Sequence, residues 1–220
     1  MEHIRLDSKE LVRCIVESYV KSRNCLYSHH NITRGTSHCI SSEIEDLFAY
    51  YIATNFDNNY RVYVDQPITC NINSSKKTIR FDLLLANSKN VVINAIELKM
   101  DLGRNRDGFI SYCIKRGNEV KALQGKKVSS KKGVTKACIN LKISAEMKWR
   151  VVIVSDKNIS KEKMENIIKN SKNLNNLEVY VLTSKTHPNV YNMKIEDAMK
   201  KIEIREEEFI RLKQNLRANI

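Results

Sequence analysis

Two acidic residues and a lysine in the middle of the chain have the types and spacing needed for hydrolytic chemistry. Asp82 lies inside an apolar segment, and Glu97-Leu98-Lys99 ends the next apolar segment, fifteen residues after Asp82. Mg²⁺ prefers oxygen ligands such as carboxylates, and a metal-bound water is a stronger nucleophile than free water. An ammonium group beside that water offsets the charge that develops in the transition state. These residues therefore suit metal-assisted hydrolysis of a phosphodiester.

The two apolar segments are predicted to be neighbouring strands of a hairpin. They cover residues 78–86 and 91–99, and the polar residues 87–90 between them favour a turn. In such a hairpin Asp82 lies opposite or diagonal to Glu97, close enough for the two side chains to act on one group.

Alternation along the second strand brings its charged side chains together. Glu97 and Lys99 should point the same way, with Leu98 turned into the core. Charge at the end of a buried strand is costly unless a metal or a partner uses it. We therefore expect Asp82 and Glu97 to hold a metal, with the backbone carbonyl of Leu98 as a further ligand. The simpler interpretation is a salt bridge at a sheet edge, with Lys99 paired to Asp82 or Glu97.

The Glu-x-Lys tripeptide is uninformative by itself. It also begins at Glu119 and at Glu146, as chance predicts for a chain with 29% charged residues. Only Glu97 ends an apolar strand that follows another apolar strand carrying an aspartate. The prediction therefore depends on context.

In this context the residues resemble the motif of the PD-(D/E)xK nuclease superfamily, which includes many restriction endonucleases. The resemblance covers the hairpin and, more loosely, the order of elements from about residue 40 to residue 183. Phe81 stands where the family name has proline, a position at which many members differ. The resemblance implies an α/β restriction-endonuclease-like core, in which helices flank a mixed sheet made of an antiparallel meander and crossover strands. It also implies catalytic roles for Asp82, Glu97 and Lys99, with Mg²⁺ as the cofactor and Mn²⁺ as its substitute.

Members of this superfamily often add an acid from the helix before the first strand. Glu45 is our candidate, because apolar residues follow it at the second and third positions. Glu43 competes with it, since both flank the apolar stripe of the predicted helix, and adding Phe56 to the stripe favours Glu45. The preference for acids at a helix N-terminus explains both equally well. We expect Ser41 or Ser42 to cap this helix, with Glu45 completing a capping box.

The chain is strongly basic. Lys and Arg number 38 against 25 acids, which gives a formal charge of +13. This surplus favours a polyanionic partner, because neutralising phosphates releases counterions. A run of charges is also often only a solvated surface. The candidate phosphate contacts are Arg104, Arg106, Lys126, Lys127, Lys131 and Lys132, and Asp101 is a further candidate for approach to the metal.

Composition and periodicity predict one domain over residues 1–220, with its core at about 40–183 and a helix appended at each end. No apolar run approaches the roughly 20 residues that span a bilayer, and the first residues lack a signal-peptide core. The six cysteines show no CxxC spacing, so we expect reduced thiols in a cytoplasmic protein. Helices are predicted at about 7–22, 42–56, 107–124, 160–171 and 195–220, strands at about 60–70, 78–86, 91–99, 149–154 and 177–182, and a basic loop at 126–133.

The resemblance and the charge together imply a Mg²⁺-dependent endonuclease that acts on double-stranded DNA, of type II restriction or phage-defence kind. Restriction enzymes of this architecture commonly cut as dimers, so a homodimer is expected, and the charged C-terminal helix is a candidate for its interface. The alternative is a nucleic-acid-binding protein on a nuclease-like scaffold without catalysis.

Overall fold

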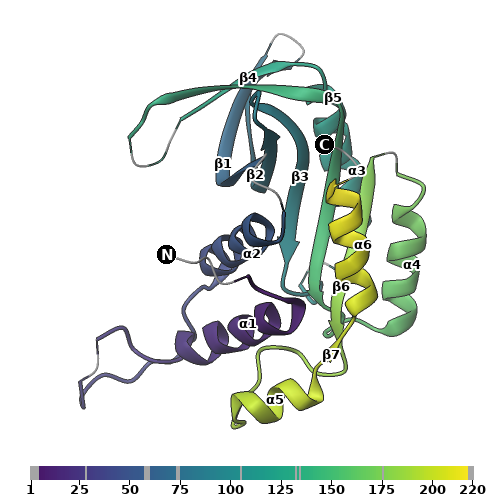
Figure 1. Ribbon diagram of the computed structural model, residues 1–220. Coiled ribbons are helices and arrows are strands. Elements are labelled where there is room, and N and C mark those ends of the chain that lie inside the picture. Colours follow the sequence, from purple (N-terminus) through teal and green to yellow (C-terminus); the bar gives the residue numbers. More distant parts are fainter. Residues whose placement is uncertain are drawn as a thin grey trace.

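The computed structural model describes residues 5–27, 29–56, 60–72, 75–104, 106–131, 133, 135–174 and 176–217 (Figure 1). Within these ranges the elements are, in order, α1 (Ser8–Ser22), α2 (Ser41–Asn55), β1 (Tyr60–Ile72), β2 (Ser75–Asn87), β3 (Val91–Lys99), α3 (Phe109–Leu123), β4 (Lys127–Lys131), β5 (Cys138–Ser155), α4 (Lys161–Ser171), β6 (Leu177–Ser184), α5 (Ile195–Lys201), β7 (Glu203–Ile204) and α6 (Glu206–Arg217). The predicted α/β class is confirmed. None of the helices described is long and apolar enough to cross a bilayer.

The strands form one mixed sheet in the order β3-β2-β1-β4-β5-β6-β7. β1, β2 and β3 make an antiparallel meander, and β3–β5 and β5–β6 are parallel pairs reached through crossovers that carry α3 and α4. Because β3 also pairs with β5, the strands β3, β2, β1, β4 and β5 close into a ring. The hairpin with Asp82 and Glu97 is therefore held between β1 and β5.

Two hydrophobic clusters hold the layers together, one on each face of the sheet. α3 and α4 contribute to the first cluster, and α1, α2, α5 and α6 contribute to the second. In β5, Val151 and Ile153 belong to the first cluster while Val152 and Val154 belong to the second. Both faces of this strand are thus buried, which explains why its sequence is continuously apolar.

Two predictions about where helices begin and end were wrong. Ser41 and Ser42 do not cap α2: the cap position is Ile40, whose carbonyl accepts from the Ile44 amide, so both serines already lie in the first turn. The predicted C-terminal helix is divided into α5 and α6. The chain between them adds β7 to the edge of β6, and the Arg205 amide donates to the Leu182 carbonyl.

The predicted basic loop at 126–133 was also wrong over most of its length. Residues 127–131 form β4, which pairs with the first part of β5, and β5 begins at Cys138 instead of near residue 149. In β4, Val128 and Ser130 are buried while the lysines beside them are exposed. This alternation of two is typical of a strand, and the lysine-rich composition hid it.

Candidate functional site

The β2–β3 ladder places Asp82 beside Glu97. Leu83 pairs with Ile96, so Asp82 and Glu97 occupy the next position of the same antiparallel register. Asp82 Oδ2 accepts a hydrogen bond of 2.6 Å from the backbone amide of Leu98. The predicted hairpin thus brings the two carboxylates together at the end of β3.

An irregularity in β1 turns the hairpin at this point. The ladder between β1 and β2 pairs Val64 with Leu83 and then Gln66 with Phe81, which leaves Asp65 and Asp82 between the two pairs. Asp65 has a φ of 45°. Phe81 and Leu83 pack into opposite hydrophobic clusters, although alternation would place them on one face. The change of face occurs at Asp82, where the strand leaves its carboxylate between the two cores.

Glu97 is the most deeply buried charge of the site. Its side chain is only 8% exposed, and Lys99 Nζ lies 2.7 Å from Oε1. The two side chains therefore point the same way, as predicted from alternation. The Tyr112 hydroxyl also lies beside the Glu97 carboxylate, and Arg116 Nη2 lies 3.6 Å from Oε2. Oε2 is buried and forms no well-aligned hydrogen bond within the described residues. The carboxylate is thus surrounded by Lys99, Arg116 and Tyr112, and one of its oxygens lacks a well-formed hydrogen bond.

Two side chains of α3, neither of them among the predicted site residues, complete the surroundings of Glu97. The Arg116 guanidinium lies 4.8 Å from the Phe81 ring centroid, and Lys99 Nζ lies 5.5 Å from that of Tyr112. Burial raises the pKa of Tyr112, and the Glu97 carboxylate raises it further. Tyr112 and Arg116 are one helical turn apart on the face of α3 that packs against the sheet. This spacing was the signal available in the sequence.

The acids of the site repel one another. Burial and then the Glu97 charge raise the pKa of Asp82 to about 6, although the Leu98 amide, Lys99 and Arg116 oppose the shift. Burial, then Asp82 and Asp65, raise the pKa of Glu45 to about 7, with smaller contributions from Asp46 and Glu97. Glu45 therefore belongs to the electrostatic environment of the hairpin.

Glu43, the competing helix acid, faces a different part of the molecule. Its Oε1 accepts a hydrogen bond of 2.6 Å from the Ser18 hydroxyl on α1. Of the two candidates on α2, the structure brings Glu45 to the hairpin and directs Glu43 to α1.

Asp101 is engaged by its neighbours rather than directed at the carboxylate pair. It accepts hydrogen bonds from the Gly103 amide (2.7 Å) and Asn158 Nδ2 (3.0 Å), and its Oδ2 lies 3.0 Å from His187 Nε2. Because the Asn189 amide donates to His187 Nδ1, the proton of the neutral ring is on Nε2 and points to Asp101. These bonds, first that of His187, lower the pKa of Asp101. Asp101 thereby joins the segment after β3 to two other loops.

A pocket of about 600 Å³ opens beside Lys99 at the end of β3. Its lining includes Lys99, Asp101, Asn158 and both predicted arginine contacts, Arg104 and Arg106. Both arginines are exposed. The structure therefore places two cations next to the proposed catalytic lysine, where they can contact a phosphate backbone.

The predicted lysine contacts are distributed elsewhere. Lys126 Nζ donates to the Asn71 carbonyl at 3.0 Å, and Lys127 lines a different pocket. Lys131 is exposed at the end of β4, where its carbonyl accepts from Gln66 Nε2, next to Asp65. Lys132 lies outside the described residues. Within the part of the chain that is described, only Arg104 and Arg106 of the predicted contacts share a pocket with Lys99.

The donor chemistry of the hairpin fits Mg²⁺. Mg²⁺ usually keeps several waters and takes only one or two protein carboxylates, so Asp82 and Glu97 are sufficient. Glu97 Oε2, which accepts no well-aligned hydrogen bond within the described residues, is an available donor. A third ligating side chain is not in place: in the described ranges no three His, Cys, Asp or Glu residues are grouped to hold a metal.

Comparisons with protein-family models, curated proteins and solved structures found no match to this chain. Three acids, Glu45, Asp82 and Glu97, lie in one electrostatic environment with two cations, Lys99 and Arg116. Such an arrangement can bind a divalent cation, exchange a proton near neutral pH and contact a phosphate from the adjacent pocket.

Proposed function

We propose that this protein is a Mg²⁺-dependent endonuclease that hydrolyses phosphodiester bonds of double-stranded DNA, of type II restriction or phage-defence kind. The observation that carries the proposal is the excess of acid at the hairpin, where the pKa of Asp82 is raised to about 6 beside the buried Glu97. Raised carboxylate pKa values next to a pocket are typical of sites that bind cations or transfer protons.

Asp82 and Glu97 would hold Mg²⁺, together with the backbone carbonyl of Leu98. When bound, the cation supplies an acidified water and neutralises charge on the phosphate. The carboxylates contribute the negative charge that retains the cation. Glu97 also keeps Lys99 in place through the 2.7 Å ion pair.

Lys99 and the arginines act on the substrate. Lys99 lines the 600 Å³ pocket together with Arg104 and Arg106. Its ammonium can donate to a phosphate oxygen in the pocket and stabilise the charge that develops there. Arg104 and Arg106 hold the neighbouring phosphates. Glu45, with a pKa of about 7, is the acid of the site that can take up a proton near neutral pH.

A second candidate function is nucleic-acid binding on a nuclease-like scaffold without catalysis. One observation favours it, namely that no three ligating side chains are grouped in the described ranges. In this alternative the Lys99–Glu97 ion pair is structural, and the basic residues account for the binding of nucleic acid.

Plasmid cleavage with Mg²⁺ separates the two functions. We expect wild-type protein to convert supercoiled plasmid to discrete products, and Asp82→Ala and Lys99→Ala to lose about 100-fold or more of that rate. Asp197→Ala and Lys200→Ala are matched controls, because these residues form an exposed ion pair on α5. Salt-sensitive binding of DNA without cleavage by the wild type would reject the nuclease and favour the binding scaffold.

A further inference from the structure

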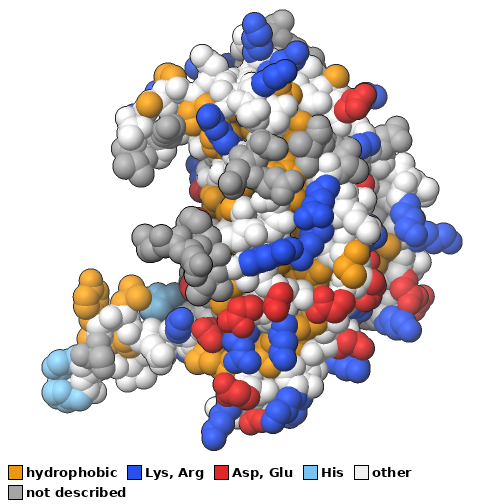
Figure 2. Space-filling model, viewed as in Figure 1, with side chains coloured by type: hydrophobic (Ala, Val, Ile, Leu, Met, Phe, Trp, Pro, Cys, Tyr) orange, Lys and Arg blue, Asp and Glu red, His pale blue; other side chains and the backbone are white. Residues whose placement is uncertain are grey.

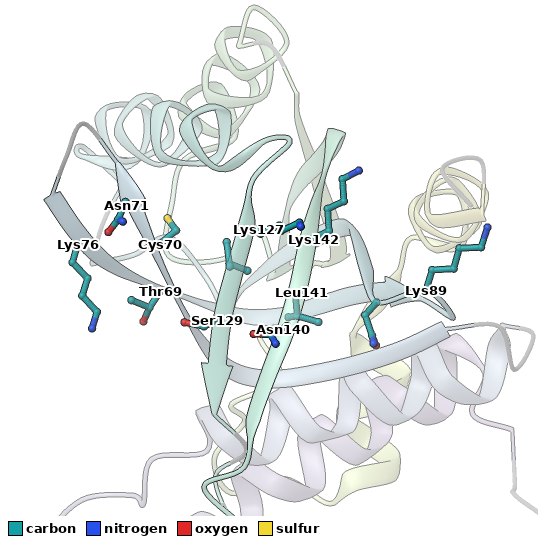
Figure 3. A pocket seen from close by; sticks show the side chains of 12 residues that line it. Thr69, Cys70, Asn71, Lys76, Lys89, Lys127, Ser129, Asn140, Leu141 and Lys142 are labelled. Carbon is teal, nitrogen blue, oxygen red and sulfur yellow. The ribbon is translucent and has the colours of Figure 1, made fainter.

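A second basic pocket lies at the start of β3, away from the carboxylate site. It is an open pocket with a volume of about 630 Å³, lined by residues of β1, β2, β4 and β5 and of the turn after β2 (Figure 3). Four lysines line it, Lys76, Lys89, Lys127 and Lys142, and its described lining contains no acidic residue. Lysine and arginine side chains are also visible over these strands in the space-filling view, whereas acidic side chains gather in its lower half (Figure 2).

The positive charge in this pocket is uncompensated. Lys127 and Lys142 are direct partners in the β4–β5 ladder, and like charges in that position destabilise a sheet. All four lysines are exposed, and none forms an ion pair within the described ranges. A bound anion would relieve the repulsion between Lys127 and Lys142, which nothing in the described protein relieves.

The polar part of the remaining lining lies on the same face of the sheet as Lys127 and Lys142. Ser129 and Asn140 are direct partners in the β4–β5 ladder, two residues from these lysines along each strand, whereas Val128 and Leu141 between them alternate into the hydrophobic core. Pockets of this volume bind small organic ligands. A nucleotide combines phosphates with a base whose edge carries hydrogen-bonding groups, and so matches both the lysines and the Ser129–Asn140 pair.

We infer that this pocket binds a nucleotide, with Lys127 and Lys142 on its phosphates and Asn140 at its base. The nucleotide is either free or one unit of a nucleic-acid strand. The pocket reaches Asn90 at the start of β3, whereas Lys99 is at the other end of that nine-residue strand. A strand of this length spans about 26 Å, so the pocket and the carboxylate site are separate. The inference therefore does not depend on the proposed nuclease activity.

Binding measured in EDTA tests the inference without any cleavage. The probes are ATP, inorganic tripolyphosphate and a short fluorescein-labelled oligothymidylate. The variant Lys127→Gln with Lys142→Gln is compared with Lys169→Gln with Lys172→Gln. The control pair is exposed on and just after α4 and removes the same charge.

We expect the pocket variant to weaken binding of ATP and of the oligonucleotide about tenfold or more, and the control variant less than about twofold. For the oligonucleotide, loss of two phosphate contacts should also reduce the slope of log K against log salt by about 1.4. Equal affinities in the two variants would overturn the inference. Circular dichroism melting excludes misfolding, because removing the Lys127–Lys142 repulsion should leave the melting temperature unchanged or higher.

The base contact has its own test. ATP should bind at least about fivefold more tightly than tripolyphosphate, and Asn140→Ala should remove most of that difference. Equal binding of the two anions would overturn the assignment to a nucleotide. Tighter binding of the oligonucleotide than of ATP assigns the pocket to a strand, and the reverse order assigns it to a free nucleotide.

Discussion

Buried charged side chains have different partners in two regions of the same sheet. Arg150 of β5 is 0% exposed. Its two terminal guanidinium nitrogens donate hydrogen bonds, and its Nε forms a close ion pair. Nη1 donates to Asn94 Oδ1, Nη2 donates to the Asn215 carbonyl at 2.8 Å, and Nε lies 2.9 Å from Glu178 Oε2. At the β2–β3 hairpin, by contrast, the buried Glu97 Oε2 lies 3.6 Å from Arg116 Nη2, and Asp82 and Glu45 form no ion pair within the described chain.

The difference separates charge used for folding from charge available for chemistry. Arg150 joins β3, β5, β6 and α6, and its acidic partner Glu178 is its direct neighbour in the β5–β6 ladder. At the hairpin, burial and then the repulsion between acids raise the pKa of Asp82 and of Glu45 on α2. Breaking a paired network destabilises the fold, whereas an excess of one sign is costly unless a ligand of the opposite sign binds.

Removing Arg150 should have the largest effect on stability. Arg150→Ala leaves Glu178 without its buried partner, and we expect a loss of about 3–5 kcal/mol in the free energy of unfolding. Urea titration at pH 7 measures it. Arg106→Ala, an exposed arginine, should cost less than about 0.5 kcal/mol. Similar losses for the two variants would show that the Arg150 network is not structural.

Asp82→Asn should change the free energy of unfolding in the opposite direction, toward greater stability. The pKa of Asp82 is raised to about 6 in the folded state, so the folded protein holds a proton that the unfolded chain releases at lower pH. Stability therefore falls as pH rises from about 4 to 6 and stays lower above that. In EDTA at pH 8 we expect Asp82→Asn to be more stable than wild type by about 1 kcal/mol. Destabilisation, measured against Asp197→Asn on α5, would contradict the acid excess.

Glu45→Gln should have a smaller effect with a pH dependence of its own. The pKa of Glu45 is raised from 4.5 to about 7, so wild-type stability should fall relative to the variant as pH rises through this window. Because Glu45 is partly exposed, we expect a gain of about 0.5 kcal/mol at pH 8 and none at pH 4. Glu43→Gln, two residues earlier on α2 and directed to Ser18 of α1, should show no such change. Urea midpoints at several pH values decide this, and parallel profiles for the two variants would remove Glu45 from the site.

The hairpin could be predicted because its signals are local. Apolar alternation, the polar turn at 87–90 and the position of Asp82 are all read within about twenty-two residues, and β3 begins and ends where expected. The sequence favoured Glu45 over Glu43 only because Phe56 extends the apolar stripe of the predicted helix. Both pKa shifts, however, need the packing of α2 against the hairpin, which the sequence does not contain.

The remaining features depend on contacts that are distant in sequence. Arg116 reaches Glu97 across nineteen positions, and His187 reaches Asp101 across eighty-six. β4 was missed because its partner strand begins inside a segment with no continuous apolar run. The closed ring of strands and the basic pocket follow from that missed pairing, so neither was accessible to the sequence analysis.

Thermal unfolding with and without Mg²⁺ tests the central claim that the acid excess at the hairpin is a cation site. At Mg²⁺ tenfold above its Kd, wild type should gain about 1.4 kcal/mol over its stability in EDTA. Asp82→Asn should gain little, because it lacks one of the two carboxylates. Equal stabilisation of both proteins, or none of wild type at millimolar Mg²⁺, would contradict the account.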